Sequence, residues 1–151
     1  ERYHNGEAIS HFERVKLVEL PLNARLEDVV GGINERIAAQ GRIKLERGIV
    51  EMGINGIPAW KAEPLHARIG ETHVWTVTNN TPFDHPFHLH GYFFQVLDDQ
   101  RVPEWKDTVN VPVKSTVRIA MTFDERPGMW MYHCHILDHA EVGMMGHLHV
   151  Q

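Results

Sequence analysis

The sequence is poor in three features, and each absence narrows its function. It has a single cysteine, Cys134, among 151 residues, so an internal disulfide is excluded. The thiol is left as a metal ligand, a nucleophile or an inert core group. No stretch approaches the roughly 18 apolar residues that a membrane-spanning helix requires. There is also no run of basic residues, and the net charge is −5, so we expect neither a membrane span nor a nucleic-acid partner.

Histidine, by contrast, is abundant. The chain has 12 histidines against 15 lysines and arginines together. Half of the histidines gather in two short clusters, which are His85, His88 and His90, and His133, His135 and His139. An isolated histidine on a strand is more often an ordinary polar residue than a ligand. Two tight clusters, one of them around the only cysteine, instead predict a metal site.

Most of the chain has the sequence pattern of an all-β domain. From residue 41 onward, short β-like runs are separated by Gly, Pro, Asn and Asp, a pattern typical of a sandwich or barrel. The clearest run is 116–123, where Val117, Ile119 and Met121 alternate with other residues at period two. Further strands are predicted at 43–52, 73–79, 92–97, 130–135 and 145–150. We assign residues 41–151 to this domain.

Residues 1–40 have a mixed pattern, and we interpret them as a lead-in or linker segment from a preceding domain. They include a strand-like stretch over 14–20 that is followed by Pro21. Asn23 is a candidate N-cap for a short helix, and helix-forming residues follow at 33–40. The first residue is Glu1, so we expect that a native start, and any secretion signal, precedes this segment.

The alternation of side chains along a strand sorts the candidate ligands into two groups. His133 and His135 should point to one face, while Cys134 points to the other. If the first cluster is extended, His88 and His90 share a face and His85 turns away from it. The clusters therefore predict two adjacent sites that are joined through the backbone of Cys134.

One predicted site combines a thiolate, two imidazoles and a thioether, from Cys134, His85, His139 and Met144. This set matches a trigonal electron-transfer copper site with a weak axial methionine. Zinc is the main competitor, but a thioether is a poor zinc ligand. The other site is an all-imidazole group of His88, His90, His133 and His135, suited to a second copper centre.

The segments HPFHLHG, from His85, and HCHILDHAEVGMM, from His133, closely resemble the paired signatures of multicopper oxidases, the family of laccases, bilirubin oxidases and ceruloplasmin. The resemblance covers about residues 41–151 and implies a C-terminal cupredoxin domain, a Greek-key β-sandwich or barrel. It implies type 1 ligands His85, Cys134 and His139 with axial Met144, a type 2 ligand in His88, and type 3 ligands in His90, His133 and His135. It also implies dioxygen as oxidant, about four coppers per active unit and an extracytoplasmic location.

The resemblance also exposes a deficit. The family's trinuclear cluster uses eight histidines, and the matching positions here supply only four. The pair His147 and His149 has suitable spacing but lies on the predicted final strand, where an edge pair is the better interpretation. We therefore expect the remaining histidines from a further cupredoxin domain or chain, so that this sequence is the C-terminal piece of a larger enzyme or one chain of an assembly.

Two acids are candidates for proton supply. Many bacterial members have an acid directly after the second type 1 histidine, where this chain has Ala140. Asp138 and Glu141 flank that position, and either can substitute for it. A role as ordinary solvated loop carboxylates fits the sequence about as well.

The electron donor is predicted from a similar comparison. Metal-oxidising members often have an acid four residues before the first type 1 histidine, where this chain has Thr81. A methionine-rich segment is also missing, because Met52, Met121, Met129 and Met131 are dispersed and are predicted to fill the core. We therefore expect a phenol or aromatic amine that meets the edge of His139 or His85.

Three functions remain in competition. The leading hypothesis is a laccase-like oxidase that reduces dioxygen to water. A copper nitrite reductase also connects a type 1 cysteine to a histidine site, but through one flanking ligand, whereas Cys134 has histidine on both sides. A blue-copper electron carrier or copper-binding module needs only the first site and leaves the all-imidazole group without a purpose. The copper content of the assembled protein discriminates the oxidase, with about four coppers per active unit, from the carrier, with one.

Overall fold

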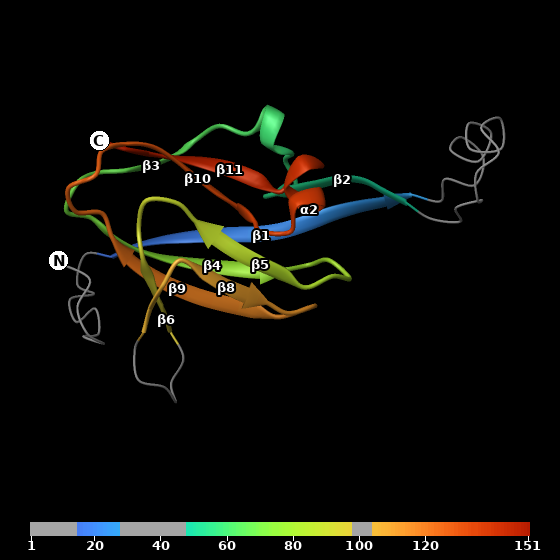
Figure 1. Cartoon of the computed structure of the whole chain (residues 1–151), viewed down its shortest axis with the longest axis horizontal. Helices are drawn as coiled ribbons and strands as arrows, with labels where there is room; N and C mark the ends of the chain where they lie inside the picture. The colour runs from blue at the N-terminus through green and yellow to red at the C-terminus, as the bar shows by residue number, and fades with distance from the viewer. Residues whose placement is uncertain (1–14, 28–47, 98–103) are drawn as a thin grey trace.

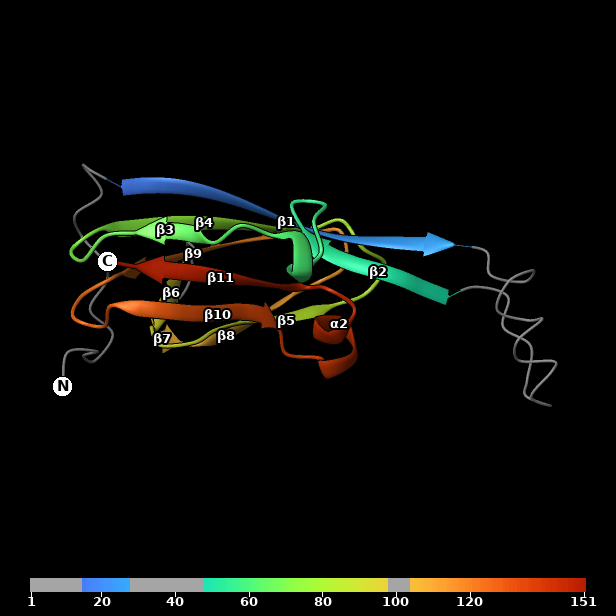
Figure 2. The ribbon, with the colours of Figure 1, turned by 90° about the horizontal axis from the view of Figure 1, so that it is seen from above.

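The computed structural model describes residues 15–27, 48–97 and 104–151, and these form two β-sheets that pack face to face. One sheet has the order β2-β1-β4-β9-β6-β7 and the other β3-β11-β10-β5-β8. Figure 2 shows the two layers, with β1 and β4 in one and β10 and β5 in the other. The all-β fold class predicted from the sequence is therefore confirmed.

The elements follow the chain in a simple order (Figure 1). The first sheet consists of β1 (Val15–Glu27), β2 (Gly48–Ile54), β4 (Thr72–Asn79), β6 (Phe94–Val96), β7 (Trp105–Lys106) and β9 (Thr116–Thr122). The second sheet consists of β3 (Leu65–Ala67), β5 (His85–Leu89), β8 (Thr108–Val111), β10 (Gly128–Cys134) and β11 (Met145–Val150). A 3-10 turn, η1 (Ala59–Lys61), and one short helix, α2 (Leu137–Glu141), complete the described residues.

The predicted strands agree well with the observed ones where turn residues bound them. The strand at 145–150 has the predicted ends, and the strand at 116–123 ends one residue earlier. The strand predicted at 92–97 is reduced to Phe94–Val96. The start of the strand predicted at 43–52 lies outside the described residues, and β2 continues beyond its predicted end to Ile54.

Strand β1 corrects the interpretation of the N-terminal segment. It continues through Pro21 to Glu27 and lies between β2 and β4, antiparallel to the first and parallel to the second. Pro21 is accommodated because its carbonyl accepts a hydrogen bond from the Asn55 N–H, at 2.8 Å, and a proline lacks only the donor. Residues 15–27, which we expected in a lead-in, thus belong to the sheet.

The same strand rules out the helix predicted at Asn23. Asn23 lies in the middle of β1, where its Nδ2 donates to the carbonyl of Pro21 at 2.9 Å. Leu20 and Leu22 are fully buried on the core face of this strand, and that burial outweighs a local capping preference. The helix-forming residues at 33–40 lie outside the described residues.

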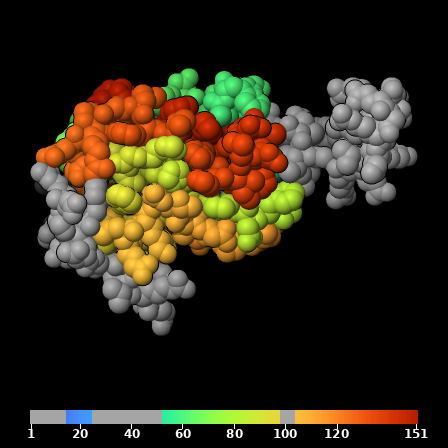
Figure 3. All heavy atoms as spheres, in the orientation of Figure 1, coloured from blue at the N-terminus to red at the C-terminus, as the bar shows by residue number. Residues whose placement is uncertain are grey.

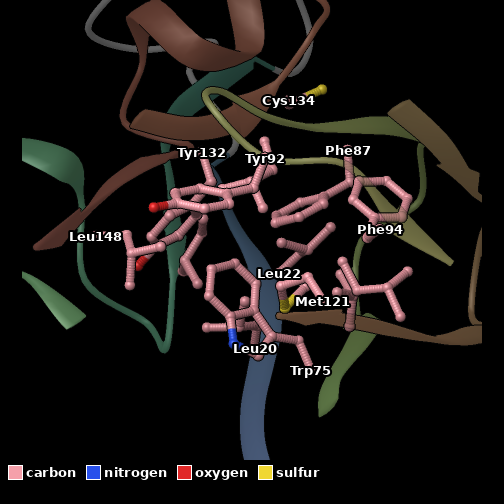
Figure 4. Close-up of a cluster of buried hydrophobic side chains, with 14 of the residues drawn as sticks. Leu20, Leu22, Trp75, Phe87, Tyr92, Phe94, Met121, Tyr132, Cys134 and Leu148 are labelled. Atoms are coloured by element: carbon pink, nitrogen blue, oxygen red, sulfur yellow. The ribbon is translucent and has the colours of Figure 1, made fainter. Parts of the chain in front are cut away.

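The core lies between the sheets and is rich in aromatic rings (Figure 4). Trp75 meets Tyr132 edge to face with ring centroids 5.3 Å apart, and Phe87 is fully buried beside them. Cys134 is buried at the edge of this cluster. On β5 the buried residues are His85, Phe87 and Leu89, so the core faces one side of the strand and leaves His88 on the other.

Two methionines break the expected pattern. Met52 and Met121 are buried as predicted, but Met129 and Met131 are 52% and 37% exposed. Both lie on β10 at an even spacing from His133, so they share its outer face and cannot reach the core. The prediction that they fill the core is wrong.

Within the described part of the chain, no helix has the length and apolar character that crossing a membrane requires.

Candidate metal centre

Three elements bring the first group of donors together. His85 begins β5, Cys134 ends β10, and His139 lies on α2. The antiparallel pairing of β5 with β10 places Phe87 opposite Cys134, and so brings the first residues of one strand to the end of the other. The chain then turns back through α2, and the segments lie side by side on the face shown in Figure 3.

The donor atoms of this group form a compact triangle. The Nδ1 atoms of His85 and His139 are 3.2 Å apart, and they lie 3.4 Å and 3.6 Å from the Sγ of Cys134. A point in the plane of the three atoms and equidistant from them is about 2.0 Å from each. Imidazole and thiolate ligands bind a divalent metal ion such as zinc at roughly 2.0–2.3 Å. The triangle therefore fits a bound metal ion.

Burial sets the protonation of these groups. It lowers the pKa of His85 to about 4, an effect to which the neighbouring His139 adds, and it also lowers the pKa of His139. Both rings are therefore neutral near pH 7 and have a lone pair to offer. Burial raises the pKa of the Cys134 thiol to about 11, so this group needs a metal ion to stabilise its thiolate.

Met144, the predicted axial ligand, lies next to this triangle. It is fully buried. Its N–H donates to the carbonyl of His139, and its own carbonyl accepts from the N–H of Cys134, both at 3.1 Å. These two backbone bonds hold residue 144 against the other predicted ligands.

The second group collects four imidazole rings on the outer face of the sheet. The ring of His88 lies 4.5 Å from that of His90, 5.4 Å from that of His133 and 5.3 Å from that of His135. The Nε2 atoms of His90 and His133 are 2.9 Å apart. Ligand atoms of His88, His90 and His133 all lie within 4.8 Å of one another, and His135 stands beside this trio.

Backbone carbonyls orient two of these rings. His88 Nδ1 donates to the carbonyl of Asp107 at 2.8 Å, and His133 Nδ1 donates to the carbonyl of Cys134 at 2.8 Å. Because a carbonyl only accepts, each Nδ1 carries the ring proton and each Nε2 keeps its lone pair. Both rings are thereby prepared to bind a metal through Nε2.

The structure brings two hydroxyl groups to the candidate ligands, and the sequence analysis assigned a role to neither. Thr108 supports His88, since its Oγ1 lies 3.0 Å from His88 Nδ1. Thr81, singled out only because it is not an acid, is fully buried with its Oγ1 2.6 Å from His85 Nε2. Neither contact leaves a local sequence signal, because each depends on how separate segments pack.

The two predicted proton donors lie near the first group. Asp138 and Glu141 are both exposed, on α2, on either side of His139 in the sequence. Both acids are therefore accessible to water.

Comparison with known proteins identifies the family. Residues 36–151 match the family model described as multicopper oxidase. The chain belongs to the multicopper oxidase family. It is 40% identical to the multicopper oxidase MmcO of Mycobacterium tuberculosis over 60% of this chain and 18% of that protein. It is 31% identical to the multicopper oxidase mco of Staphylococcus epidermidis over 96% of this chain and 34% of that protein.

Solved multicopper oxidases share the fold. A metallo-oxidase of this family from Campylobacter jejuni superposes with a TM-score of 0.74 at 27% identity, over 95% of this chain and 31% of that one. The predicted cupredoxin-like sandwich is therefore confirmed, and copper is the cofactor that the family indicates. The chain spans about a third or less of the length of these multicopper oxidases.

Proposed function

We propose that this chain is the type 1 copper domain of a laccase-like oxidase, which takes single electrons from a reducing substrate and passes them to a trinuclear centre that reduces dioxygen to water. One observation carries the proposal. The adjacent residues His133 and Cys134 belong to two different donor groups, one of four imidazoles and one with a thiol. A simple electron carrier has no use for the imidazole group.

The proposed ligands follow from this division. His85, Cys134, His139 and Met144 would hold the type 1 copper, and His88, His90, His133 and His135 would hold their share of the type 2 and type 3 coppers. Copper bound at these positions supplies one-electron redox chemistry and the reduction of dioxygen. The chain supplies the connection, since the backbone of Cys134 joins the groups and its carbonyl also accepts the His133 Nδ1–H bond at 2.8 Å.

Electrons are proposed to enter at His139. His139 is 9% exposed, whereas His85 is completely buried and cannot meet a donor. Phe83 lies 5.6 Å from the His139 ring, and Leu137 on the same short helix is 70% exposed. These two apolar side chains favour a small aromatic reductant, such as a phenol or an aromatic amine.

The remaining parts of the proposal concern protons, location and partners. Asp138 or Glu141 supplies protons from the surface beside His139. The whole protein acts outside the cytoplasm, as expected from the family resemblance. The other four cluster histidines come from a further cupredoxin domain or chain.

Copper analysis combined with oxygen uptake tests this function. We expect the full 151-residue chain alone to reduce no dioxygen to water, because half of the cluster ligands are missing. Assembled with a domain that provides two His-x-His pairs, it should hold about four coppers per active unit and consume oxygen with a phenol. One copper per unit in that assembly, without oxygen uptake, would favour the electron carrier instead.

A further inference from the structure

We infer that Asn79 and Thr81 are positioning residues that determine which ring nitrogen of His85 is free to bind the metal. The inference rests on the proposed copper function and concerns residues outside the ligand set. Both residues are completely buried: Asn79 ends β4, and Thr81 lies two residues beyond it. Together with His85 they form a chain of short hydrogen bonds.

The first step is the orientation of the Asn79 amide. Its Nδ2 lies 2.6 Å from the carbonyl oxygen of Phe83, 2.9 Å from that of Val111 and 3.2 Å from that of Pro112. Carbonyl oxygens only accept, so the atom that faces them must be the nitrogen. The opposite atom, Oδ1, accepts from the Thr81 N–H at 2.9 Å, which fits no other assignment.

The second step is the direction of the Thr81 hydroxyl. This group has one proton to give, and two of its neighbours are pure acceptors: Asn79 Oδ1 at 2.7 Å and the carbonyl of Phe83 at 3.1 Å. When the proton goes to Asn79, the Thr81 oxygen can only accept from His85 Nε2 at 2.6 Å. The His85 proton is then on Nε2.

The third step is the consequence for the metal site. With its proton on Nε2, His85 presents the lone pair of Nδ1 toward Cys134 Sγ, 3.4 Å away, and His139 Nδ1, 3.2 Å away. The opposite tautomer would point an N–H into this triangle and block the position of the metal. In that tautomer His85 Nε2 would accept the Thr81 hydroxyl proton, and Asn79 Oδ1 would lose it. The series of hydrogen bonds from Asn79 through Thr81 to His85 therefore orients the His85 ring for metal binding before a metal is bound.

Substitution of the hydroxyl tests the inference in the metal-free chain. We expect ¹⁵N-histidine NMR of the full chain at neutral pH to find His85 protonated on Nε2, with the signal assigned by its loss in His85→Gln. Thr81→Val keeps the shape of the side chain but removes the hydroxyl, and we expect it to populate the Nδ1–H form. Thr81→Ser keeps the hydroxyl and should resemble wild type.

Metal affinity gives a second readout that does not depend on oxidase activity. Co(II) is the probe, followed through its cysteine-thiolate absorption. We expect Thr81→Val to weaken its binding by roughly 10- to 100-fold and Thr81→Ser to leave it nearly unchanged. Thr72→Val is the matched control, because it removes a hydroxyl bonded to Thr122 at 2.8 Å at the far end of β4. It should leave Co(II) affinity unchanged.

The outcomes separate this inference from the proposed function. Wild-type affinity in Thr81→Val, even with a lowered unfolding temperature, would show a merely structural role and overturn the inference. A predominant Nδ1–H form in the wild-type chain would overturn it even if the valine variant did not fold. If Co(II) affinity and tautomer respond as expected while the assembled protein reduces no dioxygen, the oxidase function fails and the positioning role stands.

Discussion

His133 and Cys134 are neighbours in the chain, yet they serve opposite faces of β10. The Nε2 of His133 lies 2.9 Å from that of His90 on the outer face, and the Sγ of Cys134 lies 3.4 Å from His85 Nδ1 on the buried face. One peptide unit thus separates an imidazole group from a thiol group. The carbonyl of Cys134, in the following peptide unit, accepts the proton of the His133 ring, so the connection is both covalent and hydrogen-bonded.

Removal of the thiol should interrupt electron transfer between the two donor groups. We expect Cys134→Ser to abolish the intense blue thiolate-to-copper absorption and oxidase turnover of the assembled enzyme, because a serine hydroxyl does not ionise to replace a thiolate as ligand or conduit. The histidine-bound coppers should remain. Absorption spectra and copper analysis measure both, and retained blue colour in the variant would contradict the type 1 assignment.

The surface around His139 should determine the choice of electron donor. We expect the kcat/KM of the complete enzyme to be higher for simple phenols than for Fe(II) or Cu(I), since Phe83 packs beside the His139 ring, Leu137 is exposed on the same helix and Thr81 stands where metal-oxidising members often have an acid. Leu137→Ser should raise the KM for a phenol with little change in kcat. Leu17→Ser is a matched control, because Leu17 is 74% exposed on β1 and Leu137 is 70% exposed on α2. A clear preference for metal ions would refute the prediction.

A buried histidine away from the proposed copper sites should make stability depend on pH. His73 is 1% exposed, its Nε2 donates to Glu71 at 2.9 Å, and its Nδ1 accepts from the Trp75 indole at 3.2 Å. Burial lowers the pKa of His73, because it disfavours the charged ring more than the hydrogen bond to Glu71 favours it. Between that lowered pKa and the unfolded value near 6.5, the unfolded chain binds more protons, so stability falls as the pH falls.

The contribution of His73 can be isolated by difference. Other buried histidines, His85 and His139 among them, shift in the same direction. We therefore compare wild type with His73→Gln in urea unfolding at about pH 7.5 and about pH 5.5. The wild type should lose more unfolding free energy on acidification than the variant, which no longer has this titrating group. Equal losses would show that His73 does not contribute.

Gly91, which ends the first histidine motif, should resist substitution for two reasons. Its φ is +81°, and a Cβ built on it would collide with the indole ring of Trp130. Gly70 has a similar φ of +91° but no atom within 4 Å of a built Cβ. We expect Gly70→Ala to cost about 1 kcal/mol of unfolding free energy from the backbone alone. Gly91→Ala should cost about 1–3 kcal/mol more from overpacking, measured by urea unfolding.

Two properties of the sequence, the alternation of side chains along strands and the chemistry of the candidate ligands, were sufficient for several of the predictions. The all-β fold class and the division of histidines from Cys134 both follow from the period of two along a strand, which holds wherever a strand forms. Ligand chemistry then grouped residues as distant as His85 and His139, because few combinations of thiolate, imidazole and thioether suit a metal. These inferences need no knowledge of which strands are neighbours.

The tertiary structure decided which face of each strand is buried and what surrounds each ligand. Met129 and Met131 lie outside because β10 turns its other face to the core, and residues 15–27 join the sheet because β1 finds partners in β2 and β4. Thr81 reaches His85 because the end of β4 is tied to β8 through Asn79. Such contacts depend on the packing of segments far apart in the chain, and local periodicity carries no information about that packing.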